Sequence, residues 1–449
     1  MNSHSSLLAI SPVDGRYHSI TRGLSNYFSE YALLKYRCTV EIEYFIALCN
    51  LPLPQLKKFP KNKFSLLRKI YTEFSPAEAE HIKKIEKETN HDVKAVEYYI
   101  KEKFRMLKLQ EYEEFVHFGL TSQDINNTAI PVSLKECFND VILPLINDVL
   151  ELLKSKVVEW DKISMLSRTH GQPASPTMLG KEIEVFYVRL KNQLAQLKSI
   201  PFSGKFGGSV GNFNAHYTTY PDINWHDFAN KFLVNQLGIL RSYPTTQIEH
   251  YDNLAAFCHA MSRINTIMID YCRDTWLYIM LDYFKLKHRK NETGSSAMPH
   301  KINPIDFENA EGNLETANSL YHFLAGKLPV SRLQRDLTDS TVLRNIGTPV
   351  AHNIIAFNSI IKGIKKLEVN KKSVENDLKN HPEVLSEAIQ NILRREQYPK
   401  PYEMLKEFTR NNKLITIKDL HQFIDSLKIS AKLKNELKKL KPEDYTGKK

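Results

Sequence analysis

Apolar residues recur at helical spacing over long stretches of this chain. Along Leu134–Trp160 they return every third or fourth residue, which keeps one stripe facing a protein interior, and Pro144 is expected to bend or interrupt that helix. A second stripe covers Ile183–Leu197 and ends shortly before Pro201, as helix ends commonly do. Alternation typical of strands is sparse. The pattern therefore predicts a mainly helical protein.

The segment Asn253–Lys287 contains neither glycine nor proline and is apolar on more than one side. A helix of this length would span about 50 Å. Its apolar faces need neighbours all around it, and two more helical stretches, Phe307–Leu328 and Thr341–Leu367, are expected to pack beside it. The simplest architecture is a bundle of very long helices, buried further by other subunits.

With 449 residues, the chain is longer than one compact core usually accommodates. We expect an all-α fold with three helical domains, namely an N-terminal domain over 1–111, a central bundle of very long helices over 112–364 and a C-terminal domain over 365–449. Polar, glycine-rich interruptions are where chemistry usually lies beside such a rigid scaffold. They occur at Ser167–Gly171, Gly204–Asn214, Tyr243–Asp252 and Asn291–Pro304.

Composition narrows the class of protein. Hydrophobic residues make up 42% and charged residues 25%, as in ordinary globular proteins. The N-terminus lacks the pattern of a signal peptide, and no apolar run is long enough to span a membrane, so a cytoplasmic protein without a membrane partner is expected. The cysteines are five, widely spaced and without a C-x-x-C pair, which predicts free thiols packed as small apolar groups and no zinc site.

The net charge of +11 raises the expectation of an anionic partner, whether nucleic acid, acidic lipid or a phosphorylated small molecule. Lysines concentrate near the C-terminus, from Lys432 to Lys449. No aromatic residues on which bases could stack are interleaved with them, so we interpret this run as a solvated helix face and a tail. Nucleic acid is therefore not the expected partner.

One polar loop carries a recognisable string. Residues 291–304 read NETGSSAMPHKINP, and this string resembles the signature loop of the fumarase/aspartase superfamily, S-S-x-M-P-x-K-x-N, at every fixed position. His300 occupies a slot that looks like glycine in fumarases and histidine in the adenylosuccinate lyase family. A Gly-Ser-Ser turn by itself is too common to decide anything.

Further segments resemble the adenylosuccinate lyase family over nearly the whole chain. They are SPVDGRY at 11–17, TNHDVKAVE at 89–97, HFGLTSQD at 117–124, SRTHGQPA at 167–174 and RDLTDSTVLR at 335–344. Gly119 and Gln123 depart from some relatives, and neither is given a role. Each motif residue has a structural alternative, since His170 can be a structural histidine, His91 can cap its helix and Arg344 can be a surface ion-pair partner. Their joint occurrence in one ordered set favours function.

The resemblance implies a β-elimination that releases fumarate from adenylosuccinate, and likewise from the succinylated imidazole carboxamide ribotide, in purine biosynthesis. It implies that Ser295 is the base, with Ser296 as the alternative, that Lys301 lowers the pKa of this base and that Asn303 holds a carboxylate. His170 would be the general acid, and His91 would tune this acid or contact the phosphate. No cofactor is implied, and the sequence contains no dinucleotide-binding or P-loop fingerprint.

The resemblance also implies a homotetramer whose subunits share active sites. Arginines suit the phosphate of a nucleotide substrate, because guanidinium groups match its oxygens. The implied substrate-binding residues are Arg16, Tyr17, Asn90, His91, Asp92, Thr121, Ser122, Gln247, Ser296, Lys301, Asn303, Asn309, Arg335, Ser340, Thr341, Val342, Leu343 and Arg344. Other lyases of the superfamily, such as argininosuccinate lyase or fumarase, and a catalytically silent helical scaffold are the alternatives.

Overall fold

The structure is a computed structural model that describes residues 6–287, 297–298, 300–411 and 415–447. Helices dominate it, which confirms the all-α prediction. The chain forms two compact units, each assembled from segments far apart in sequence. The first comprises Met1–Ile146, Gln193–Thr266 and Gly312–Asn358, and the second comprises Asn147–Asn192, Ile267–Glu311 and Ser359–Lys449. The three domains expected from the sequence, over 1–111, 112–364 and 365–449, remain a prediction.

The first unit is built on a large apolar core around α3. This helix begins after Ser29, whose hydroxyl accepts a hydrogen bond from the Ala32 amide at 3.1 Å. Apolar side chains cover most of its surface, and Phe45 meets Phe104 edge-on with ring centroids 4.8 Å apart. The main helices around this core are α3 (Glu30–Leu48), α4 (Phe64–Thr72), α5 (Pro76–Thr89), α6 (Asp92–Met106), α7 (Ser122–Cys137) and α11 (Trp225–Phe232).

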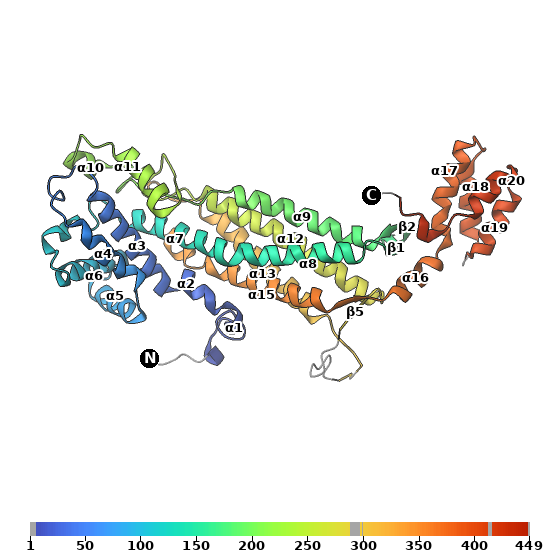
Figure 1. Cartoon of the computed structure of the whole chain (residues 1–449), viewed down its shortest axis with the longest axis horizontal. Helices are drawn as coiled ribbons and strands as arrows, with labels where there is room; N and C mark the ends of the chain where they lie inside the picture. Colours follow the sequence, from blue (N-terminus) through green and yellow to red (C-terminus); the bar gives the residue numbers. More distant parts are fainter. Residues whose placement is uncertain (1–5, 288–296, 299, 412–414, 448–449) are drawn as a thin grey trace. The chain divides into compact units, whose positions relative to one another are not determined.

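Long helices lie side by side within each unit, as the bundle prediction expected (Figure 1). Within the first unit, Asn265 of α12 is hydrogen-bonded to Asn318 of α13 at 2.8 Å and to Asn353 of α15 at 2.5 Å. Within the second unit, Tyr278 of α12 donates to Glu182 of α9 at 2.8 Å. The long helices are α8 (Leu143–Glu159), α9 (Leu179–Ser199), α12 (Asp252–Met280), α13 (Ile305–Lys327) and α15 (Gly347–Lys366).

Shorter elements complete both units. The strands pair as β1 with β2 and β5 with β6, both antiparallel, and β3 with β4, parallel. Their bounds are β1 Ser164–Thr169, β2 Gln172–Met178, β3 Ser203–Gly204, β4 Leu240–Arg241, β5 Phe284–Leu286 and β6 Leu367–Val369. The remaining helices are α1 His18–Thr21, α2 Ser25–Phe28, α10 Asn214–Thr219, α14 Thr338–Leu343, α16 Lys371–Lys379, α17 Ser386–Arg395, α18 Pro401–Asn411, α19 Ile417–Ser426 and α20 Ala431–Lys438.

The predicted interruption by Pro144 is confirmed, and it takes the form of a π-helical turn. The residues Phe138–Ile142 form this turn between α7 and α8. Proline has no N–H to donate and its ring crowds the carbonyl four residues earlier, that of Asp140. The wider π turn at Asp140 removes this clash while the chain stays helical.

Two predicted helices differ from the structure. The helix predicted over Asn253–Lys287 ends at Met280, because Asp282 takes a left-handed conformation with φ of +58° and the chain continues into β5. The helix predicted over Thr341–Leu367 is two helices, α14 and α15. They separate before Gly347, where a side chain would lie 2.5 Å from Phe28.

The segment Ser167–Gly171 lies in the connection between α8 and α9, as predicted. It belongs to the hairpin of β1 and β2, with His170 and Gly171 at the turn. Both turn residues have positive φ, at +54° and +73°, which matches the tight turn that joins twisted antiparallel strands in two residues. The hairpin carries His170 at its tip.

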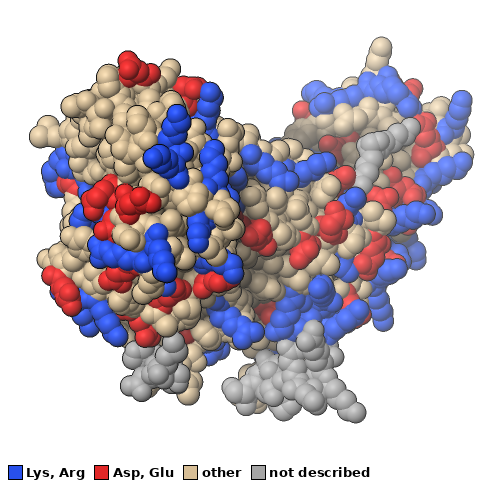
Figure 2. Space-filling view, turned by 60° about the vertical axis from the view of Figure 1, so that its left-hand side comes forward, with Lys and Arg blue, Asp and Glu red and all other residues tan. Residues whose placement is uncertain are grey.

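The structure confirms the expectation for the cysteines. All five cysteines are buried free thiols. On the face that Figure 2 shows, lysines and arginines are interspersed with aspartates and glutamates. Among the described residues, no helix combines the length and the apolar character that a membrane crossing requires.

Candidate active site

A cavity of about 160 Å³ in the first unit brings together predicted substrate-binding residues from distant parts of the sequence. Asp92 comes from the start of α6, Ser340 and Leu343 from α14, and Arg344 follows α14. Helices α2, α3 and α7 provide the rest of the wall. The cavity is therefore polar where the predicted residues lie and apolar around Phe28 and its neighbours.

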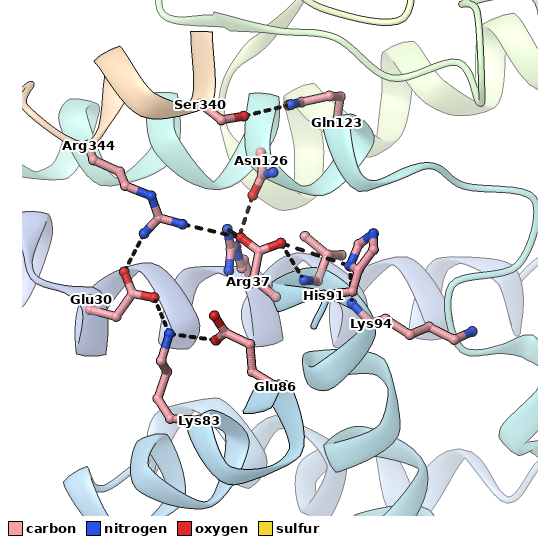
Figure 3. Close-up of polar contacts among 12 residues, drawn as sticks. Glu30, Arg37, Lys83, Glu86, His91, Lys94, Gln123, Asn126, Ser340 and Arg344 are labelled. Atoms are coloured by element: carbon pink, nitrogen blue, oxygen red, sulfur yellow. Dashed lines mark hydrogen bonds and ion pairs between the residues drawn. The ribbon is translucent and has the colours of Figure 1, made fainter. Parts of the chain in front are cut away.

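Arg344 is held between two carboxylates at this cavity (Figure 3). Its Nη1 lies 2.5 Å from Oε2 of Glu30, and its Nη2 lies 3.3 Å from Oδ2 of Asp92. The same Oδ2 of Asp92 accepts from Nη2 of Arg37 at 2.6 Å. Because the Arg344 side chain is still 45% exposed, its guanidinium has open surface for an anion such as phosphate.

Both carboxylates stay ionised because cations surround them. Burial opposes ionisation of Asp92, but Arg37 and Arg344 outweigh it and hold the pKa of this carboxyl below its usual range. Burial likewise opposes ionisation of Glu30, and Arg344 and Lys83 lower its pKa. Lys83 lies 3.1 Å from Glu30. Alternating charges thus fix the orientation of Arg344.

Helix starts place these carboxylates. Glu30 is the first residue of α3, directly after the capping Ser29, and Asp92 is the first residue of α6. Carboxylates at a helix N-terminus are favoured by the helix dipole. His91 caps α6, since its Nδ1 accepts a hydrogen bond from the Lys94 amide at 3.1 Å. Helix capping, the structural alternative that the sequence left open for His91, is therefore observed. The ring is exposed, so its Nε2 is accessible to another partner.

Gln123 is buried and contacts the site, contrary to the expectation that it has no role. Its Nε2 donates to Oγ of Ser340 at 3.2 Å, and Nη2 of Arg335 donates to the same oxygen at 3.2 Å. Oδ1 of Asp339 accepts from the Ser340 amide at 2.7 Å and lies 4.0 Å from Nε of Arg335. These contacts fix Ser340 and Arg335 relative to each other.

Thr121 and Ser122 lie at the start of α7, where a buried ion pair holds the backbone. Asp124 accepts from the Thr121 amide at 2.8 Å through Oδ2. Its Oδ1 accepts from Nζ of Lys205 at 2.8 Å and from the Gly207 amide at 2.8 Å. Asp124 and Lys205 are fully buried, and burial lowers the pKa of Lys205 even though Asp124 opposes the shift.

The other predicted residues of the first unit lie on turns and helix ends. Arg16 is exposed and its guanidinium lies 5.9 Å from the centre of the Tyr17 ring. Asn90 ends α5 in a left-handed conformation with φ of +50°. Gln247 lies in the predicted connection before α12 and is half-buried. Thr341 and Val342 belong to α14, with Thr341 exposed and Val342 half-buried.

The second unit carries His170 and Lys301, whereas His91, the other predicted catalytic residue that the structure describes, belongs to the first unit. His170 is exposed at the tip of the β1–β2 hairpin. Lys301 is exposed and Asn303 half-buried just before α13. Asn309 of α13 donates from Nδ2 to Oγ of Ser359 at 2.8 Å. Ser295 and Ser296 lie outside the described residues.

Glu30, Arg37 and Asn126 are among the cavity residues that the sequence analysis did not predict. Glu30 and Asn126 belong to no recognised motif. Arg37 had one available signal, because it is the single arginine of a largely apolar helix and is flanked by Tyr36 and Cys38. A charged residue at such a position is buried and paired in most proteins.

Comparison with known proteins agrees with this assignment of motifs. A family model described as lyase matches residues 15–317, and one described as adenylosuccinate lyase C-terminal matches residues 331–446. The chain is 55% identical to an adenylosuccinate lyase of Dictyostelium discoideum, over 98% of this chain and 97% of that protein. It is 48% identical to one of Vibrio cholerae and 46% identical to one of Escherichia coli K12, each over 99% of this chain and 97% of the relative.

Solved structures share the fold at low sequence identity. A fumarate lyase from Mesorhizobium sp. BNC1 superposes with a TM-score of 0.73 at 15% identity, covering 95% of both chains. A 3-carboxy-cis,cis-muconate lactonizing enzyme from Pseudomonas putida gives 0.71 at 17% identity, over 95% of this chain and 94% of that one. Given the near full-length identity to its relatives, this chain belongs to the adenylosuccinate lyase family.

Proposed function

We propose that this protein is a C–N lyase that splits adenylosuccinate into AMP and fumarate. The same elimination would release fumarate from the succinylated imidazole carboxamide ribotide, because the eliminated succinyl group is the same. The observation that carries the proposal is the convergence of Asp92, Ser340 and Arg344 on one cavity with a guanidinium open to an anion. A fumarase or aspartase substrate has no phosphate, so an open guanidinium at this place favours a nucleotide substrate.

The reaction proceeds as a β-elimination. Ser295, or Ser296 in its place, removes a proton from the carbon next to a carboxylate of the succinyl group. The electron pair of that C–H bond becomes the new C=C bond, the C–N bond breaks, and His170 gives a proton to the departing nitrogen. The carbanion-like intermediate carries extra negative charge, which Lys301 and Asn303 offset. His91 tunes the acid or contacts the phosphate.

Substrate recognition divides into two ends. The succinyl carboxylates bind at Thr121, Ser122 and Asn303, with Gln247, Ser296 and Asn309 as further contacts. The nucleotide end binds at Arg16, Tyr17, Asn90, Asp92, Arg335 and the 340–344 segment. Arginine forks suit phosphate oxygens, and the contacts between Arg335 and Ser340 support a shared binding surface.

The reaction itself is tested by the ultraviolet absorbance of purified protein mixed with adenylosuccinate. We expect conversion to AMP and fumarate without added cofactor. Argininosuccinate and malate serve as controls under the same conditions. Formation of fumarate from either of them, with adenylosuccinate untouched, would mean that the superfamily is right and the substrate wrong.

Replacement of Arg335 by alanine should raise KM for adenylosuccinate by roughly 10- to 100-fold, because one hydrogen bond to a charged group is worth about 1.5–3 kcal/mol. Thermal stability should change less than KM, because the contacts of Arg335 with Ser340 and Asp339 at 3.2 and 4.0 Å are long. Arg332→Ala is the matched control, because Arg332 is 77% exposed and pairs with Asp336 at 3.0 Å. An unchanged KM for Arg335→Ala would remove this residue from the site.

The predicted residues come from both units and from distant motifs, so we also propose a homotetramer in which subunits share active sites. Sedimentation of a fully active monomer would contradict this assembly. A cytoplasmic location belongs to the same proposal. Five buried free thiols support it, since reducing compartments keep cysteines in this state.

A further inference from the structure

Arg37 is a buried cation that the proposed reaction does not use. Its side chain is only 2% exposed, yet it lines the cavity beside Arg344. Nε donates to Oδ1 of Asn126 at 2.9 Å and Nη2 donates to Oδ2 of Asp92 at 2.6 Å. Nη1 is buried and has no hydrogen-bond partner among the residues that the structure describes. Burying a guanidinium is unfavourable, so the burial of Arg37 at this cavity needs a physical explanation.

The two arginines share one carboxylate oxygen. Oδ2 of Asp92 lies 2.6 Å from Arg37 and 3.3 Å from Arg344, so Arg37 makes the shorter contact. Arg37 therefore forms the closer ion pair with Asp92, and Arg344 makes only a longer contact with it. Without Arg37, the carboxylate of Asp92 would have Arg344 as its nearest cation and would draw its guanidinium closer.

An arginine drawn fully onto a carboxylate binds phosphate poorly, because its donors and its charge are already taken. We propose that Arg37 is a positioning residue for the nucleotide end of the substrate, which acts through Asp92 to keep Arg344 available to phosphate. This inference rests on the proposed function, and it adds Arg37 to the residues that determine nucleotide affinity. Asn126 supports it by fixing the guanidinium plane through Nε.

Arg37 also joins α3 to α6 and α7, so its loss lowers stability whether or not it positions Arg344. The test must therefore read out nucleotide affinity. Arg37→Met keeps the apolar volume and removes the guanidinium. Arg37→Lys keeps the charge with a single-point contact. Arg68→Met is the control. Arg68 of α4 forms a two-point ion pair with Glu43 of α3, the helix that carries Arg37, at 2.7 and 2.8 Å and away from the cavity.

For each variant, KM and kcat for adenylosuccinate are measured together with AMP binding by calorimetry and thermal unfolding. For Arg37→Met we expect KM and the AMP dissociation constant to rise about tenfold, equivalent to about 1.4 kcal/mol. We expect kcat to stay within about threefold, since the reacting groups are untouched. Arg37→Lys should recover part of the affinity, and Arg68→Met should leave both constants unchanged.

A double-mutant cycle with Arg344→Met separates positioning from a structural role. If Arg37 acts through Arg344, Arg37→Met should cost little further AMP affinity once Arg344 is gone. Additive losses would overturn the inference, as would a folded Arg37→Met with wild-type AMP affinity. If Arg37→Met does not fold, the same cycle with Arg37→Lys decides the question. A wild-type protein that binds AMP but leaves adenylosuccinate intact would contradict the proposed function and leave the cycle readable.

Discussion

Replacing Lys205 by methionine should lower the free energy of unfolding by about 3 to 5 kcal/mol, the usual cost of leaving one partner of a buried ion pair alone. Lys205 and Asp124 are both 0% exposed, and Nζ lies 2.8 Å from Oδ1. Methionine fills the volume of the lysine stem, but the carboxylate of Asp124 stays behind without its counter-ion. Its remaining donors are backbone amides, which carry no net charge.

The matched control is Lys231→Met. Lys231 pairs with Asp227 one helical turn away at 2.7 Å, with side chains 69% and 52% exposed, so its loss should cost no more than about 0.5 kcal/mol. Unfolding by urea, followed by circular dichroism, measures both variants. Adding Asp124→Asn to Lys205→Met should restore part of the stability because it removes the orphaned charge. Equal stability of the two methionine variants would contradict the buried-pair argument.

This pair also links stability to the proposed site. Asp124 accepts from the amides of Thr121 and Gly207, so it holds the start of α7 against the glycine-rich segment. Thr121 and Ser122 are proposed to bind a carboxylate of the succinyl group. A Lys205 variant that still folds should therefore also bind substrate less tightly.

The second large effect is expected on turnover. Ser295→Ala and His170→Asn should each lower kcat for adenylosuccinate by about 10²- to 10⁴-fold, the usual contribution of a positioned base or acid. Asparagine is the appropriate replacement for His170, because this residue has φ of +54° and asparagine tolerates the left-handed conformation. Folding should be unaffected, since His170 is exposed at the tip of a hairpin.

Steady-state kinetics on adenylosuccinate measure these variants, with Ser296→Ala as the control for its neighbour. If Ser295 and His170 act in one elimination step, the double variant with Ser295→Ala and His170→Asn should lose little more turnover than either single variant. A large loss in Ser296→Ala with normal turnover in Ser295→Ala would transfer the role of base to Ser296. Normal turnover in His170→Asn would mean that another group protonates the leaving nitrogen.

Periodicity alone predicted the long helices, because burying one face of a helix imposes a repeat that is visible in the sequence. The predicted stretch Ile183–Leu197 lies within α9, and Phe307–Leu328 extends one residue beyond the end of α13. Pro144 marked the π-helical turn between α7 and α8. Helix ends were less predictable. The end of α12 depends on β5 pairing with β6, which lies more than 80 residues later. The local sequence pattern around α12 does not indicate a strand partner so far along the chain.

For the site, the sequence determined which motifs are present, and with them the family, because a motif is local and keeps its residue types together. It also placed Asp92, Ser340 and Arg344 in one functional set. Only the tertiary structure decided what each of them touches. Glu30, Arg37 and Asn126 meet these residues at the cavity through contacts between α3, α6, α7 and the end of α14. Such pairings depend on how helices pack, and the free energy that selects them is spread over the whole core of the unit.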